Sequence, residues 1–155
     1  MADTSPRTQL HTELTMVVTA LWHDIDHHDG CGAAAFFTPD ASLTFSRRTF
    51  QGRAAIDEVY RERRARGPRV SRHTVTNLHI VQDGPDYIDA VSALVLYAQD
   101  GAPPIPTTTP VLIADVHDRF VRADPTGPSG PWLIAARRLE NQFLAPGDVL
   151  AVPTT

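Results

Sequence analysis

The sequence predicts a single α+β domain in which three N-terminal helices cover a strongly curved, mostly antiparallel sheet. Two observations predict this fold class. Up to residue 66 the apolar residues recur mainly at spacings of three and four, the period of a helix; beyond Pro68 they recur at every second residue, and β-branched residues dominate. A length of 155 residues is usual for one domain. We therefore expect one domain over residues 1–155, with its core at about 8–143 and a flexible C-terminal tail.

Three helices are expected before residue 67. The first spans residues 8–28, where one face collects Leu10, Leu14, Val17, Val18, Leu21, Trp22 and Ile25. A short second helix at residues 33–37 follows a glycine-containing break. The third spans residues 52–66 and ends at Gly67 and Pro68. Between the last two helices, residues 41–45 and 49–51 are expected to pair as short strands.

Four long strands are expected after Pro68, at residues 70–82, 87–99, 111–122 and 132–142. No helical pattern separates them, which favours an antiparallel meander. Each is longer than the usual five or six residues, and long strands twist and curl. We therefore expect a concave sheet whose uncovered part forms a ligand pocket.

Composition argues against several classes of partner. The net charge is −4, and the six arginines between Arg61 and Arg72 have no interleaved aromatic residues, so nucleic-acid binding is not expected. No apolar run is long enough to span a membrane, and the N-terminus lacks the pattern of a secretory signal, which indicates a cytoplasmic protein. The single Cys31 cannot form an internal disulfide. No phosphate-binding glycine loop or nucleophile elbow is present, so no cofactor is expected.

Asp26 and His73 are the first candidates for catalysis. Asp26 follows Ile25 close to the apolar face of the first helix, where a carboxylate needs a partner. Strand alternation places His73, Val75, Asn77 and His79 on one side of the first long strand. If that side faces the concavity, Asp26 can orient the His73 imidazole and raise its basicity. The alternative is a purely structural histidine.

Asp115 is a second carboxylate candidate, on a strand face with Ile113 and His117. It can supply the complementary proton, or it can pair with an arginine of the next strand. A metal site is a weaker alternative, built from Asp26, His73 and the adjacent His27 and His28, because neighbouring residues on a helix point about 100° apart. No metal is expected.

The predicted substrate pocket is largely apolar and aromatic. Its lining is expected to comprise Trp22, Phe37, Phe45, Tyr60, Asn77 and Tyr97. The phenol of Tyr97 can polarise a carbonyl, whereas most such tyrosines only pack in a core. The aromatic residues of this set equally suit a plain hydrophobic core.

The segments 26–30, 36–45, 52–56 and 72–77, followed by long strands, resemble the SnoaL-like proteins of the nuclear transport factor 2-like superfamily. The resemblance spans about residues 10–141 and implies a cone-shaped α+β barrel. Scytalone dehydratase is the most similar member in its polar residues. Its catalytic aspartate and histidine look like Asp26 and His73, a pocket asparagine falls near Asp115, and a substrate-polarising tyrosine falls near Phe45.

The resemblance implies a cofactor-independent acid/base enzyme for a cyclic, largely apolar natural-product intermediate, and relatives commonly form homodimers. Dehydration, isomerisation and ring closure all remain open, because the superfamily hosts many reactions. One alternative is an epoxide-opening hydrolase or cyclase that uses Asp115. Alternatives of another class are a non-catalytic binding or assembly module and the small subunit of a ring-hydroxylating dioxygenase.

Overall fold

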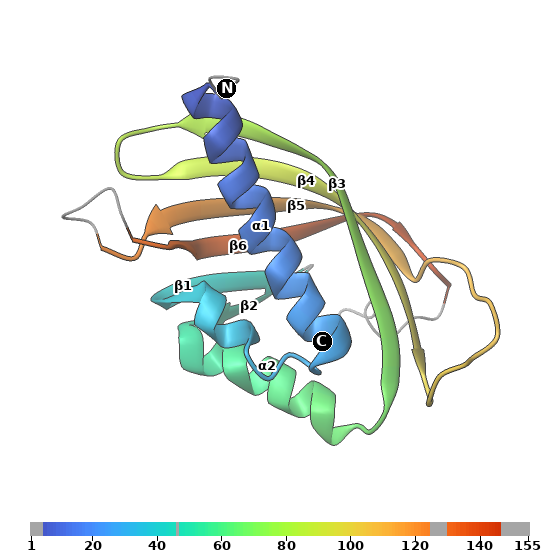
Figure 1. Ribbon diagram of the computed structural model, residues 1–155. Helices are drawn as coiled ribbons and strands as arrows, with labels where there is room; N and C mark the ends of the chain where they lie inside the picture. The colour runs from blue at the N-terminus through green and yellow to red at the C-terminus, as the bar shows by residue number, and fades with distance from the viewer. Residues whose placement is uncertain (1–4, 46, 125–129, 147–155) are drawn as a thin grey trace.

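The fold is α+β, and the described residues form two α-helices and one six-stranded sheet. The computed structural model describes residues 5–45, 47–124 and 130–146. The elements in chain order are α1 (Pro6–His27), a 3₁₀ turn (Ala33–Phe36), β1 (Phe37–Phe45), β2 (Arg48–Gln51), α2 (Arg53–Ala65), β3 (Arg69–Asp83), β4 (Ile88–Asp100), β5 (Leu112–Arg122) and β6 (Trp132–Leu144). Figure 1 shows α1 lying across the concave side of the curved sheet, with α2 beside β1 and β2. No helix within these ranges is long and apolar enough to cross a membrane.

The first helix forms where the period of three to four is strongest. Ser5 caps its start by accepting a hydrogen bond from the Thr8 backbone N–H, and Pro6 occupies the first turn, where its missing N–H costs nothing. The helix ends where Asp29 and Gly30 take positive φ angles of 54° and 70°. Its buried residues are Leu14, Val18, Leu21, Trp22 and Ile25, which pack against the sheet. The sequence prediction for this helix is confirmed.

The expectation of three helices is wrong at the second one. Residues 33–36 form only a single 3₁₀ turn, and β1 begins directly afterwards at Phe37. Four residues are too few for a stable α-helix, and extended pairing of Phe37 with Ile134 on β6 competes with helix formation. The third predicted helix corresponds to α2, and the four predicted long strands correspond to β3 to β6.

The sheet has the strand order β2-β1-β6-β5-β4-β3. Four of the neighbouring pairs are antiparallel, whereas β1 and β6 run parallel. The sheet is therefore mostly antiparallel, as predicted. The parallel pair lies outside the predicted meander, because it joins the first strand to the last one.

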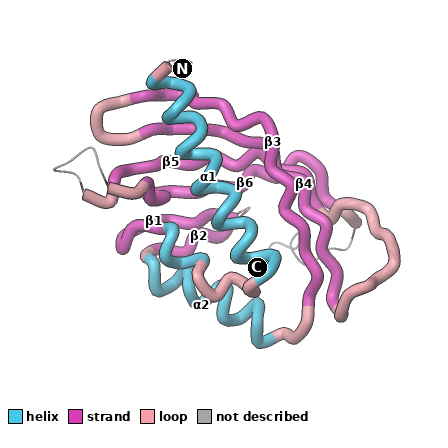
Figure 2. The backbone as a smooth tube through the Cα atoms, in the orientation of Figure 1, coloured by secondary structure: helices cyan, strands magenta, loops and turns pink. Residues whose placement is uncertain are grey.

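A β-bulge at Asn77 reverses the side-chain alternation along β3. Asn77 has a positive φ of 55°, and the register with β4 shifts between Thr76 and His79. Before the bulge Ser71 and His73 face the interior; after it Ile80 does, so Asn77 and His79 are exposed. The predicted alternation is therefore wrong beyond Val75. Figure 2 shows β3 and β4 bending together along their length, as a bulge favours.

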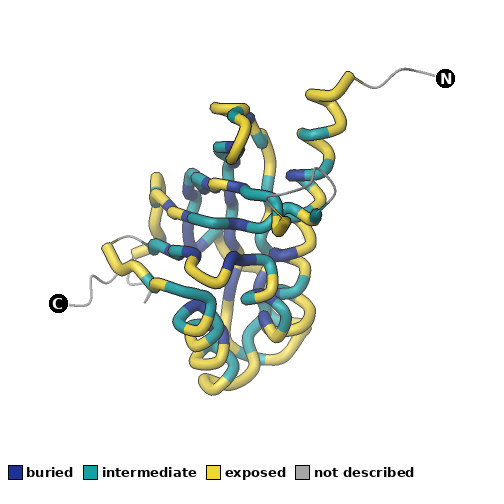
Figure 3. Tube along the Cα trace, turned by 90° about the vertical axis from the view of Figure 1, so that its left-hand side faces the viewer, coloured by how far each residue is buried: buried dark blue, intermediate teal, exposed yellow. Residues whose placement is uncertain are grey.

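The hydrophobic core fills the space between α1 and the concave face of the sheet. Figure 3 shows the buried segments in the inner turns of the helix and along the strands, with exposed residues outside. Alternate residues of β4 and β5 contribute to it, among them Leu94, Leu96, Ala114 and Val116. A polar side chain on the concave face is therefore buried and needs a hydrogen-bond partner there.

Candidate active site

Asp26 and His73 are in direct contact. Asp26 lies in the last turn of α1, and His73 lies near the start of β3. His73 Nδ1 is 2.6 Å from Asp26 Oδ1, and the His73 backbone N–H donates to Asp26 Oδ2 at 2.8 Å. Both side chains are buried, with 9% of His73 and 7% of Asp26 exposed. The predicted contact is present, and its catalytic role remains a prediction.

The backbone contact follows from the place of β3 at the edge of the sheet. An edge strand leaves one row of N–H groups without a strand partner. The Asp26 carboxylate satisfies one of these groups, that of His73, and orients its ring at the same time. One carboxylate thus fixes both the backbone and the side chain of the histidine.

Ser71 binds the same Asp26 oxygen as the His73 ring, and Arg63 in turn binds Ser71. The Ser71 hydroxyl donates to Asp26 Oδ1 at 2.7 Å and accepts from Arg63 Nη2 at 3.0 Å. Ser71 is two residues before His73 on the same face of β3, and Arg63 comes from α2. Asp26 of α1, Ser71 of β3 and Arg63 of α2 are therefore linked by consecutive hydrogen bonds.

The electrostatics of the pair define its protonation. Burial alone raises the pKa of Asp26, but the hydrogen bonds and charge of His73, with the Ser71 hydroxyl, outweigh it and lower that pKa to about 2. Burial lowers the pKa of His73 by more than Asp26 raises it. At neutral pH the carboxylate is ionised and the ring is neutral, so Nδ1 carries the proton donated to Asp26. His73 Nε2 is then unprotonated, and it makes no hydrogen bond to any residue in the described part of the chain.

Trp22 connects the dyad to a buried ion pair. Its indole stacks on the His73 ring at a centroid distance of 4.3 Å and an angle of 10°. Arg137 Cζ lies 4.8 Å from the centre of the indole. Nε and Nη2 of Arg137 each donate to the Asp118 carboxylate at 2.7 Å. Asp118 and Arg137 are direct cross-strand partners on β5 and β6, and both are buried.

The other predicted aromatic residues on the inner side are mostly core. Phe37 is fully buried, and Tyr60 of α2 packs so closely under Gly30 that a Cβ there would lie 2.8 Å from its ring. Burial raises the pKa of Tyr60 to about 12, so its phenol stays neutral. Phe45, at the end of β1, is half-buried and meets Phe50 edge to face.

Asp115, Asn77 and Tyr97 do not lie with the dyad. Asp115 alternates with the buried residues of β5 and accepts a hydrogen bond from Gln142 at 3.0 Å on the exposed side. Tyr97 is 39% exposed, because the adjacent Leu96, not Tyr97, shares the buried face. Asn77 turns outward at the bulge. Asp115 and Asn77 therefore lie away from the dyad, whereas Tyr97, on the opposite face of β4 from Leu96, lines a surface pocket together with Ser71.

Sequence reasoning missed Ser71, Asp118 and Arg137. A signal for Asp118 was available, because it shares the parity of Leu112, Ala114, Val116 and Phe120, the apolar face of its strand. A carboxylate on that face requires a buried partner.

The fold does not assemble the alternative metal site. His28 Nδ1 lies 3.5 Å from Asp24, and the ring of His27 lies 4.4 Å from that of His23. Within the described ranges, no three His, Cys, Asp or Glu side chains gather as metal ligands do. At His73 the ring is instead held by a single carboxylate, that of Asp26.

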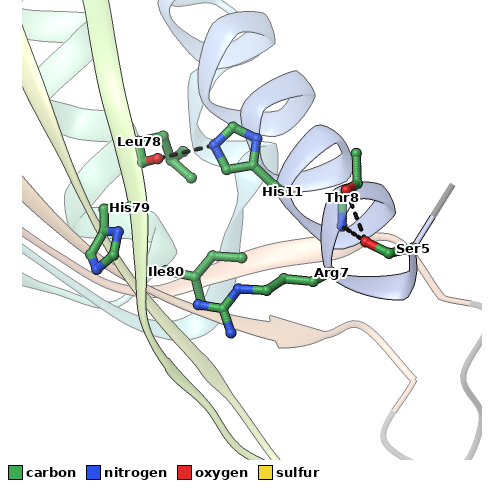
Figure 4. A pocket seen from close by; sticks show the side chains of 7 residues that line it. All are labelled: Ser5, Arg7, Thr8, His11, Leu78, His79 and Ile80. Carbon is green, nitrogen blue, oxygen red and sulfur yellow. Dashed lines mark hydrogen bonds between the residues drawn. The ribbon is translucent and has the colours of Figure 1, made fainter.

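Two surface pockets flank the helix and the sheet. The larger, of about 340 Å³, lies between the start of α1 and the part of β3 beyond the bulge, where a His11 ring nitrogen is 3.0 Å from the Leu78 carbonyl oxygen (Figure 4). None of its lining residues belongs to the dyad. The smaller, of about 220 Å³, is lined by Ser71, Tyr97 and residues of the β4–β5 loop. Of these two pockets, the second includes Ser71, which donates a hydrogen bond to Asp26.

Solved structures of other proteins share this fold. A protein from Catenulispora acidiphila, solved in complex with S-DNPA, is 27% identical, with 86% of this chain and 93% of that chain covered and a TM-score of 0.71. A protein of unknown function from Mycobacterium tuberculosis is 26% identical, over 92% and 81% of the chains, with a TM-score of 0.69. ActVI-ORFA from Streptomyces coelicolor is 22% identical over 90% and 99%, with a TM-score of 0.74, which shows the fold alone.

No curated protein matches the sequence at a significant level. The model of the SnoaL-like domain family matches residues 6–138, which includes α1, β3 and most of β6. The match covers most of the chain and includes both residues of the dyad. The chain therefore belongs to the SnoaL-like domain family.

Proposed function

We propose that this protein is a cofactor-independent enzyme that moves a proton on a cyclic, largely apolar small molecule through Asp26 and His73. One observation carries the proposal. The buried His73 ring is held by a 2.6 Å contact of Nδ1 with an ionised carboxylate, which leaves Nε2 as an unoccupied base. A histidine in this state is suited to accept a proton from a substrate.

The proposed step is general base catalysis. His73 Nε2 takes a proton from the substrate, and the ionised Asp26 stabilises the imidazolium that forms. The same ring then returns the proton at another atom, which gives isomerisation, or to a leaving hydroxyl, which gives dehydration. A positioned base of this kind contributes about 10² to 10⁴-fold, so orientation must supply the rest.

The surroundings of the dyad favour an apolar ring system as substrate. The Trp22 indole stacks on His73, and the buried aliphatic Leu96 is its cross-strand partner. The Catenulispora relative was solved in complex with S-DNPA, which supports a bound ligand here. By family resemblance we propose a natural-product intermediate, and a cytoplasmic homodimer as the working form.

The test uses 2-tetralone, a cyclic ketone with exchangeable protons, in deuterated buffer with exchange followed by NMR. We expect the protein to accelerate exchange and His73→Ala to lower the rate by about 10² to 10⁴-fold. Asp26→Asn should lower it at least about tenfold, because an amide can hold the imidazole in the wrong tautomer. The rate of the native protein should persist below pH 6.5, because burial lowers the pKa of His73.

His117→Ala is the matched control. His117 is an exposed histidine on the outer face of β5, near Glu140, and its loss should leave the exchange rate unchanged. Equal exchange rates in the native protein and His73→Ala, with both folded, would contradict catalysis by the dyad. The non-catalytic binding module would then be the better description.

A further inference from the structure

Three buried polar atoms have no hydrogen-bond partner among the described residues: Trp22 Nε1, Ser92 Oγ and Arg137 Nη1. Their residues all face the interior between α1 and the concave side of the sheet. Burying a polar group without a partner is unfavourable, and native proteins do so rarely. Two of the three, on Trp22 and Arg137, belong to side chains in contact with each other, and this pair of donors points to a partner from outside the chain.

Arg137 is positioned for such a partner. Its Nε and Nη2 atoms form a two-point contact with Asp118, so the guanidinium is fixed in the plane of that carboxylate. Only 1% of the side chain is exposed. The ion pair compensates the charge of Arg137 but uses only part of its donors, and the N–H groups of Nη1 are left without an acceptor.

These donors lie next to the dyad. The Trp22 indole contacts both groups, with the His73 ring centre 4.3 Å and Arg137 Cζ 4.8 Å from it. The positive charge of Arg137 is close enough to contribute to lowering the pKa of His73. The Trp22 indole therefore contacts both the His73 ring and the Arg137 guanidinium.

The chemistry of the two nitrogens defines the ligand class. An indole N–H and a guanidinium can only donate hydrogen bonds, so they exclude a cation or another donor as partner. They suit an oxygen that carries a full or partial negative charge. Carbonyl, enolate and phenolate oxygens on an otherwise apolar ring have this property.

We propose that Arg137 Nη1 and Trp22 Nε1 bind the oxygen-bearing edge of the substrate, which is therefore a cyclic ketone or phenol. The inference rests on the proposed function of the dyad. His73 Nε2 removes a proton from the carbon next to the carbonyl, the electrons of that C–H bond form a C=C bond, and the carbonyl electrons move to the oxygen. The resulting enolate accepts hydrogen bonds from Arg137 and Trp22, and the proton on His73 returns to carbon afterwards.

The test compares two probes of similar shape, 2-naphthol and 2-methylnaphthalene, by fluorescence titration. Only the first carries an oxygen. We expect the native protein to bind 2-naphthol about tenfold more tightly or better, as one hydrogen bond to a charged donor allows. Trp22→Phe keeps an aromatic ring against His73 and removes only the N–H, so it should weaken 2-naphthol binding about fivefold and leave the hydrocarbon within about twofold.

Arg137→Lys is the second variant, because a lysine can still pair with Asp118 and lacks Nη1. It should also reduce the preference for 2-naphthol. Trp132→Phe is the matched control, since the Trp132 indole N–H is already used by Glu13 at 2.8 Å. Its preference should equal that of the native protein.

His73→Ala separates this inference from the proposed function. The preference for 2-naphthol should survive in that variant while proton exchange is lost. If His73→Ala loses proton exchange but the native protein shows no preference for 2-naphthol, the donor site is overturned. The proposed function of the dyad is then unaffected. Equal binding of both probes, or binding of neither, means that the donors hold water only, and it overturns the inference. A preference that persists in Trp22→Phe and Arg137→Lys overturns it as well.

Discussion

Asp118 and Asp89 form ion pairs of the same geometry in different surroundings. The two pairs therefore show how burial changes the effect of losing a carboxylate on stability. Each carboxylate is held by an arginine through two hydrogen bonds, Asp118 by Arg137 and Asp89 by Arg119. The Asp118 pair is buried, whereas the side chain of Arg119 is 47% exposed. Removing a carboxylate from a buried pair leaves a charge that neither water nor another side chain compensates.

We expect Asp118→Ala to lower the free energy of unfolding by about 3–5 kcal/mol, because Arg137 is then buried without its partner. The matched variant Asp89→Ala should cost less than about 1 kcal/mol, because its pair is solvated. Urea denaturation of both variants measures the difference. Equal costs for the two changes would show that Arg137 finds another partner when Asp118 is absent.

At the scale of elements, β3 is shaped by its bulge. The strand must present His73 to α1 and, after the bend, Ile80 to the core. Regular alternation places residues an odd number of positions apart on opposite faces, so one extra residue is needed between the two halves. Asn77, with φ at 55°, is that residue, and asparagine tolerates this conformation better than most.

Asn77→Gly should therefore keep or slightly raise the stability of the fold, because glycine adopts a positive φ without steric cost. Asn77→Val should lower the free energy of unfolding by about 1–2 kcal/mol, since a β-branched residue is strained there. Thr76→Val, one position earlier in extended backbone, is the control and should change little. If Asn77→Val were as stable as Thr76→Val, the positive φ would not be a requirement of the bulge.

For the whole molecule, the dyad is also a structural link between α1 and the edge strand β3. The pKa of Asp26 falls from 3.8 to about 2 on folding, so its ionised form stabilises the native state. This contribution is complete above the unfolded pKa and is lost as pH falls toward 2. Burial likewise lowers the pKa of His73 below 6.5, so acid protonates the unfolded chain first and again disfavours folding.

We expect the native protein to lose stability from about pH 6 downward, with the Asp26 contribution of roughly 2 kcal/mol lost below about pH 4. The difference in unfolding free energy between the native protein and Asp26→Asn should be larger at pH 7 than at pH 3. Denaturant titrations at those pH values measure it. A difference that does not change with pH would mean that Asp26 is not ionised in the folded state.

The local pattern of the sequence determined the elements and the family. The helical period up to residue 66 and the strand period beyond it define α1, α2 and β3 to β6, because these signals depend on residues close in the chain. The same reasoning placed Asp26 on the inner side of α1 and identified His73 as its partner.

Only the tertiary structure decided which polar residues share an interior. The parallel pairing of β1 with β6 joins distant strands, and the bulge at Asn77 reverses the faces of β3. The contact of Asp118 with Arg137 depends on strand register, which the chain settles by burying one face of the whole sheet. A shift of one residue exchanges the two faces of a strand. Asp115 and Asp118 have opposite parity along β5, so the observed register places Asp118, and not Asp115, on the concave side beneath α1.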